Sequence, residues 1–153
     1  RFARQGRDGQ GFAVVAVDAD HFKIINDRHG HDAGDAALRE IAGVLRSSLR
    51  AEEALARVGG EEFLAVLETE SSDAALQAGE RMRQAVQALR IKVNGRDLPP
   101  VSVSIGIARL PADAPTLEQV LKRADQALYA AKQNGRNRVC MAEGTPETGL
   151  SSH

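Results

Sequence analysis

Several classes of protein are excluded by what this sequence has little of. A single cysteine, Cys140, excludes an intramolecular disulfide and a cysteine-based zinc site. Tryptophan is absent and aromatic residues make up 3% of the chain, which argues against a base-stacking surface for single-stranded nucleic acid. No apolar run approaches the ~20 residues that a membrane-spanning helix needs. The 20 basic and 21 acidic residues give a net charge of −1. Any phosphate ligand therefore requires a local group of cations, and we expect no nucleic-acid partner.

What is present is typical of one globular domain: 153 residues, of which 42% are hydrophobic and 27% charged. We expect residues 1–141 to form that domain. Residues 142–153 are rich in Gly, Ser, Thr and Pro, and we expect them to form a loose tail. The chain starts at Arg1 without a methionine or a signal peptide, so we expect a piece of a longer protein. The lone cysteine suggests a reducing, cytoplasmic location, and the whole protein could still be attached to a membrane.

Hydrophobic periodicity predicts the elements. Residues 12–18 are apolar on both alternations and predict a central strand covered on both faces, followed by a polar segment. Amphipathic helices are predicted over residues 32–49, 74–89 and 117–133, the last stopping at Asn134-Gly135. Residues 55–58 and 62–67 predict a hairpin whose Gly59-Gly60 pair supplies positive φ. Residues 101–107 alternate, which predicts one buried face, and residues 138–141 predict an edge strand. This order indicates an α+β fold with a mixed central sheet flanked by helices.

Acidic residues follow the first strand and the glycine pair. Asp18 and Asp20 lie at the strand end, and Glu61 and Glu62 follow Gly60. Acids in such places often only end a strand or keep a turn soluble. If the hairpin packs beside the first strand, however, Asp18 and Glu61 converge and repel each other unless a cation lies between them. Hard oxygen ligands favour Mg²⁺, which fills its other positions with water and phosphate oxygens.

Cations and amide groups that would suit a nucleotide occur elsewhere. Lys23, Lys132 and Arg136 are candidate phosphate ligands, although cations near a helix carboxyl end also stabilise its dipole. Asn26 and Asp35 flank a turn at residues 30–31, and an aspartate there could accept hydrogen bonds from guanine, whereas adenine lacks those donors. Both residues are also common in caps and turns. No glycine-rich loop with Lys-Ser/Thr is present, which excludes a P-loop mechanism.

Four blocks in order resemble the GGDEF family of diguanylate cyclases and cover roughly residues 12–140. They are residues 18–35 (DADHFKIINDRHGHDAGD), 57–63 (RVGGEEF, the GGEEF form of the name-giving motif), 104–108 (SIGIA) and 124–137 (ADQALYAAKQNGRN). The resemblance implies a ferredoxin-like core similar to polymerase palm domains, with the motif on a β-hairpin. It also implies that two GTP molecules are condensed into cyclic di-GMP and two pyrophosphates, with one GTP on each domain of a two-fold homodimer.

The resemblance also implies roles for individual residues. Two Mg²⁺ ions, or Mn²⁺ in their place, would be held by Asp18, Glu61 and the backbone carbonyl of Ala19. Guanine would be read by Asn26 and Asp35. The triphosphate would be bound by His21, Phe22, Lys23, Gly60, Lys132 and Arg136. Lys23 is expected to stabilise charge at the phosphates, and Glu61, Glu62 and a metal-bound hydroxide all stay candidates for the proton acceptor.

Two departures from the family pattern affect regulation. The family's inhibitory product site has Arg-x-x-Asp before the glycine pair, and here Arg50 is kept while Glu53 replaces the aspartate, with Arg81 as a further arginine. We expect a degenerate site with weakened or altered product binding. The family's usual opening segment is absent, with Arg1-Phe2 as its remnant, and we expect a sensor or regulatory domain outside this chain. The alternatives to an enzyme are a GTP or cyclic di-GMP binding module and a structural dimerisation domain.

Overall fold

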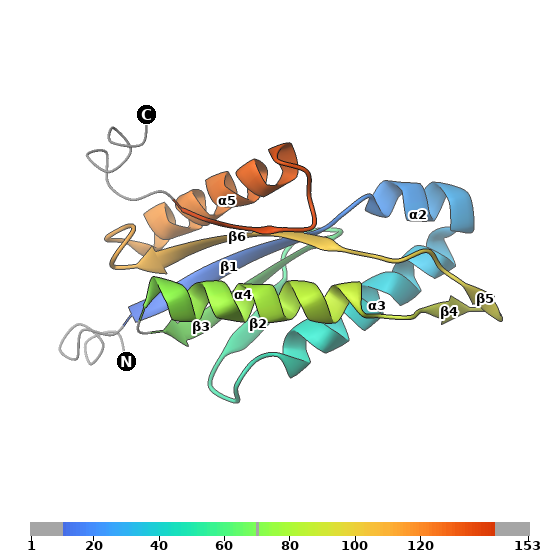
Figure 1. Cartoon of the computed structure of the whole chain (residues 1–153), viewed down its shortest axis with the longest axis horizontal. Coiled ribbons are helices and arrows are strands. Elements are labelled where there is room, and N and C mark those ends of the chain that lie inside the picture. Colours follow the sequence, from blue (N-terminus) through green and yellow to red (C-terminus); the bar gives the residue numbers. More distant parts are fainter. Residues whose placement is uncertain (1–10, 70, 143–153) are drawn as a thin grey trace.

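The computed structural model describes residues 11–69 and 71–142 as a five-stranded sheet with helices on both faces (Figure 1). The strands lie in the order β2-β3-β1-β6-β7. β1 pairs antiparallel with β3 and β6, β2 pairs antiparallel with β3, and β7 lies parallel to β6 at one edge. The bounds are β1 Gly11–Ala19, β2 Ala54–Arg57, β3 Glu62–Thr69, β6 Val103–Leu110 and β7 Val139–Met141. The predicted α+β class with a mixed central sheet is confirmed.

Two apolar layers hold the sheet. Helices α3 (His31–Ser47) and α4 (Ser72–Gln87) cover one face, where their buried side chains pack on alternate residues of β1 such as Val15 and Val17. Helix α5 (Leu117–Gln133) covers the other face and packs on Val14 and Ala16. Every residue of β1 is buried, because both of its faces carry a layer. Burial of the central strand on both faces was predicted from residues 12–18 and is observed.

The helix boundaries follow local signals. Ser71 and Thr116 cap α4 and α5, and each side chain accepts a hydrogen bond from the backbone N–H three residues later. Helix α5 ends at Gln133, as predicted from the Asn134-Gly135 pair, and Gly135 has a φ of 123°. Each helix in the described part of the chain is too short or too polar to cross a bilayer.

Three features differ from the prediction. The polar segment after β1 contains a helix, α2 (Phe22–His29). Hydrophobic periodicity does not predict this helix, because Ile25 is its one buried residue. A small ribbon, β4 (Lys92–Val93) with β5 (Arg96–Asp97), projects beyond the sheet near α3 and was not predicted (Figure 1). The expectation of one buried face for the strand in residues 101–107 was wrong, because Ser104 and Gly106 of β6 are also buried: Ser104 donates to Asp20, and Gly106 lies against the backbone of α5. The expectations for residues 1–10 and 143–153 fall outside the described residues.

Candidate active site at the carboxyl end of the central strand

Strand register brings the two predicted carboxylates to one end of the sheet. Asp18, near the end of β1, pairs across the ladder with Glu62 at the start of β3. The next rung is a hydrogen bond of 3.0 Å from the Ala19 N–H to the Glu61 carbonyl. The acids of the hairpin therefore lie beside Asp18, although more than 40 residues separate them in the sequence.

Helix α5 adds a cation from the far end of the chain. Lys132, in the last turn of α5, forms an ion pair with Oδ2 of Asp18, whose side chain is 8% exposed. The second oxygen of that carboxylate, Oδ1, is buried without a hydrogen-bond partner. A buried carboxylate oxygen is costly to leave unsatisfied, so this atom marks a position where a cation or a donor would be stabilised.

Electrostatics at Glu61 agree with a crowded acidic site. Partial burial, then the nearby carboxylate of Asp18, raise the pKa of Glu61 above 4.5; Lys132 opposes this shift and Glu62 adds to it. No cluster of three or more His, Cys, Asp or Glu side chains suited to a metal occurs in residues 11–69 and 71–142. A cation here would thus need backbone or ligand oxygens in addition to the two carboxylates, an arrangement typical of Mg²⁺ bound with a phosphate.

The glycine turn between β2 and β3 is held by an arginine. Arg57 donates from Nη2 to the Gly60 carbonyl at 2.6 Å, and its Nε lies 3.2 Å and 3.1 Å from the carbonyls of Gly59 and Gly60. The expected positive φ at this pair was wrong: neither glycine has a left-handed backbone. A side chain at Gly60 would meet no heavy atom within 4 Å, so the turn presents bare backbone to open space beside the carboxylates.

The chain leaves β1 through a tight left-handed residue. His21 has a φ of 57° and precedes Phe22, the first residue of α2. A helix start carries backbone N–H groups without intrahelical partners, which suits a phosphate. Lys23 is exposed, and its Nζ lies 3.3 Å from Oδ2 of Asp27 in a surface ion pair. Its amine is therefore directed to Asp27 and not to the carboxylates of Asp18 and Glu61.

A second left-handed turn follows α5. Arg136 and Asn137 have φ values of 63° and 46°, directly after Gly135. Arg136 is half-buried and its N–H donates to the Ala131 carbonyl at 2.9 Å. The turn thus begins right after the helix end that carries Lys132, and it presents the second predicted phosphate ligand of this region.

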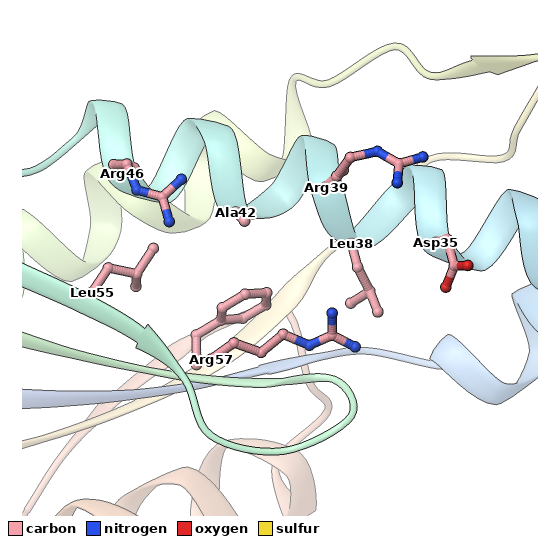
Figure 2. Close-up of a pocket in the computed structure, with 8 residues that line it drawn as sticks. Asp35, Leu38, Arg39, Ala42, Arg46, Leu55 and Arg57 are labelled. Carbon is pink, nitrogen blue, oxygen red and sulfur yellow. The ribbon is translucent and has the colours of Figure 1, made fainter.

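The two predicted guanine ligands lie on α2 and α3, on either side of the Gly30 turn. The Oδ1 atom of Asn26 is buried without a hydrogen-bond partner and lies against Gly34, the residue before Asp35. Asp35 is exposed and lines a pocket of about 410 Å³ between α3 and β2. Figure 2 shows Arg57 extending along this pocket from β2 toward the end of α3 that carries Asp35. The pocket thus contains one predicted guanine ligand, Asp35, together with Arg57, whose side chain holds the glycine turn.

The residues of the expected product site also lie together. Arg50, Glu53 and Arg81 line a pocket of about 290 Å³ beside the end of β3. The Glu53 side chain is 6% exposed and accepts from the Arg50 N–H at 2.9 Å, from Arg50 Nη2 at 3.1 Å and from the Glu68 N–H at 3.2 Å. The Arg50 guanidinium also donates to the Glu68 carbonyl at 3.0 Å. Glu53 therefore binds its own chain rather than facing the solvent.

A family model described as diguanylate cyclase, GGDEF domain, matches residues 1–138 of this chain. The chain belongs to the GGDEF diguanylate cyclase family. This GGDEF domain is 39% identical over 138 residues to diguanylate cyclase A of Treponema denticola, a match that covers 90% of the chain and 37% of that protein. It is 44% identical over 140 residues to diguanylate cyclase DgcP of Pseudomonas aeruginosa, covering 92% and 21%. The chain thus spans well under half the length of these curated relatives.

Solved structures show the same fold. The GGDEF domain of DgcB from Caulobacter crescentus, solved in complex with c-di-GMP, is 35% identical and superposes with a TM-score of 0.84, covering 93% of this chain and 84% of that one. The active GGEEF domain of a diguanylate cyclase from Vibrio cholerae is 35% identical with a TM-score of 0.82, covering 94% and 90%. The resemblance stated from the four sequence blocks is therefore confirmed at the level of family and fold.

Two residues of this GGDEF domain were given no role from the sequence. Arg57 stands before the glycine pair, and nothing in its position revealed that its side chain would fold back onto their carbonyls. Asp20 stands two residues after Asp18, and its carboxylate turns out to be buried among three hydrogen-bond donors. The one available signal was the Asp-x-Asp spacing, which does not distinguish a second ligand from a structural acceptor.

Proposed function

We propose that this domain is a diguanylate cyclase that condenses two GTP molecules into cyclic di-GMP and two pyrophosphates. The observation that carries the proposal is the group formed by Asp18, Glu61 and Lys132 beside the open backbone of Gly60, in a chain of the GGDEF family. Each 3′-oxygen forms a bond to the α-phosphorus of the other GTP. The bond from that phosphorus to the β-phosphate bridging oxygen breaks, pyrophosphate leaves, and the 3′-hydroxyl proton passes to a base.

The donor set fits Mg²⁺, or Mn²⁺ in its place, at two ions for each half-site. Asp18 Oδ1 is a buried oxygen without a partner, and partial burial together with the nearby Asp18 carboxylate raises the pKa of Glu61, which a bound cation would oppose. Asp18, Glu61 and the carbonyl of Ala19 would hold the ions together with phosphate oxygens. When bound, the ions lower the pKa of the attacking hydroxyl and neutralise charge on the phosphates.

The other side chains bind and orient the nucleotide in this proposal. Asp35 accepts hydrogen bonds at the guanine edge and Asn26 can both accept and donate them; the buried Oδ1 of Asn26 supports this role because it lacks a partner in the protein. Lys23 leaves its exposed pair with Asp27, which costs little because surface pairs contribute only about 0.2–1 kcal/mol. Glu61 and Glu62 are the candidate proton acceptors that this chain supplies. The triphosphate contacts are the backbone of His21 and Phe22, Gly60, and the side chains of Lys23, Lys132 and Arg136.

Two domains must face each other, since each supplies one GTP to a two-fold symmetric product. The curated relatives are longer than the matched domain, which supports a regulatory or sensor region outside this domain. In this proposal, that region brings two domains together and the location is cytoplasmic. The product site at Arg50, Glu53 and Arg81 is degenerate in this proposal. Its carboxylate is already occupied by hydrogen bonds within the chain, which supports weakened product binding.

The test is incubation of the domain with GTP and Mg²⁺, followed by chromatography for cyclic di-GMP. The domain is used alone and fused to a strong dimeriser, since encounter of two domains limits the rate of the isolated one. We expect product from the fusion and none from its Glu61→Ala variant. A fusion that binds GTP without forming product would overturn the cyclase proposal and favour the alternative, a GTP or cyclic di-GMP binding module.

A further inference from the structure

A buried carboxylate next to the site ties three segments of the chain together. Asp20 is 6% exposed, and both of its oxygens accept hydrogen bonds. Oδ2 accepts from the Ser102 hydroxyl at 2.7 Å and from the Asn137 N–H at 3.0 Å, and Oδ1 accepts from the Ser104 hydroxyl at 2.6 Å. The Asp20 N–H donates to the Ser102 carbonyl at 2.9 Å. Its donors come from β6, from the segment before β6 and from the turn after α5.

One of these donors holds a backbone conformation that is unfavourable by itself. Asn137 and Arg136 are consecutive non-glycine residues with positive φ; each such residue costs of order 1 kcal/mol, so this conformation persists only where its surroundings hold it. The Asn137 N–H is fixed by Asp20, and the Asn137 side-chain oxygen accepts from Arg83 of α4 at 3.1 Å. The position of Arg136 therefore depends on a hydrogen bond that its neighbour makes to Asp20.

In the sequence, Asp20 lies between residues predicted to bind the metal and residues predicted to bind the phosphates. Asp20 follows Asp18 and Ala19 and precedes His21, whose φ of 57° directs the chain into α2. Anchoring Asp20 on β6 fixes where that turn starts. The helix start at Phe22 and the turn at Arg136 are therefore held at a set separation by one acidic side chain that is itself shielded from solvent.

We propose that Asp20 is a positioning residue for the triphosphate: it holds the α2 start and the Arg136 turn at the spacing that phosphate binding needs. It acts through these segments and does not touch the substrate. The inference rests on the proposed nucleotide-binding function, and it gives Asp20 no role as a metal ligand, a guanine ligand or a proton acceptor. Loss of its charge should therefore weaken binding of a triphosphate far more than binding of a monophosphate.

The experiment measures GTP and GMP binding by calorimetry in Mg²⁺ for wild type and Asp20→Asn. Asparagine keeps the shape but offers one acceptor oxygen where three donors converge. We expect GTP affinity to fall at least about tenfold, because hydrogen bonds to a charged group are lost, and GMP affinity to change less than about twofold. An Arg136→Ala background tests the route. There, Asp20→Asn should cause a smaller loss of GTP affinity than it does in wild type, because only the route through the α2 start remains; an equal loss in both backgrounds would overturn the part assigned to Arg136.

Two further variants separate positioning from stability. Asp113→Asn is the matched control, because the Asp113 carboxylate also accepts a backbone N–H, that of Arg109 at 2.8 Å, but on the loop after β6. It should leave both affinities unchanged. If Asp20→Asn does not fold, Ser102→Ala keeps the charge and removes one donor, and it should shift the GTP-to-GMP affinity ratio in the same direction by a smaller factor.

The outcomes distinguish this inference from the function on which it rests. A wild-type domain that binds no GTP overturns both. A domain that binds GTP, with equal losses for GTP and GMP in the folded Asp20 or Ser102 variant, overturns the positioning role alone. Binding is the readout, so the positioning role is tested even if the domain proves to be a receptor that forms no cyclic di-GMP.

Discussion

Replacing Gly106 by alanine should separate α5 from the sheet, and with it Lys132 from Asp18. Gly106 lies in the middle of β6 under α5, and a Cβ there would lie 2.7 Å from the Ala127 carbonyl carbon. The Leu128 nitrogen and the Ala124 oxygen are nearer still. All three are backbone atoms, so rotation of a side chain cannot relieve the overlap. The helix itself must retreat.

The size of the effect follows from this distance. Non-bonded carbon atoms are most stable about 3.5–4.0 Å apart, so α5 must move away by at least roughly 0.8 Å. Overpacking of this kind typically costs 1–3 kcal/mol, and backbone overlap places Gly106→Ala at the upper end, about 3 kcal/mol. The matched control is Gly43→Ala on the exposed face of α3, where a Cβ meets nothing within 4 Å. It should raise the free energy of unfolding by about 0.5–1 kcal/mol, because glycine is unfavourable inside a helix.

Urea unfolding followed by circular dichroism measures both variants, and cyclic di-GMP formation by the fused domain is measured under conditions where each is folded. We expect opposite signs in stability, with activity reduced in Gly106→Ala alone. If Gly106→Ala is as stable as wild type, or if the two glycine variants change stability in the same direction, close packing of β6 against α5 does not hold Lys132 beside Asp18.

Three further predictions concern single side chains. The raised pKa of Glu61 means that its charged form is disfavoured in the folded domain, so the free energy of unfolding falls as pH rises through that pKa. In EDTA, Glu61→Gln should be more stable than wild type at neutral pH and equal to it below pH 4.5; equal stability at both would contradict this. Gly34→Ala would push against Asn26 Oδ1 and should lower GTP affinity by about tenfold in calorimetry, and an unchanged affinity would remove Asn26 from base recognition. Arg50→Ala should weaken cyclic di-GMP binding by about tenfold, whereas isotherms identical to wild type would exclude Arg50 from a product site.

Much of the fold was predictable because its elements have strong local patterns. The 17 residues of α5 lie within predicted bounds, since a threonine cap and an Asn-Gly stop flank a regular apolar face. Helix α2 was missed because a helix with one buried residue has almost no apolar periodicity. The alternation in β6 was misread because Ser104 and Gly106 look like a solvent face, yet both are buried and Gly106 lies directly against the backbone of α5.

The sequence by itself determined the family and the set of candidate ligands, because short local motifs such as residues 57–63 can be recognised without knowledge of the fold. Tertiary structure alone decided which of those residues meet. Pairing of β1 with β3 brings Glu61 to Asp18, and packing of α5 brings Lys132 to the same carboxylate. It also gave Asp20 its role, because its three donors come from residues 82 to 117 positions away along the chain. Contacts over such separations depend on strand order and helix packing, which no local pattern encodes.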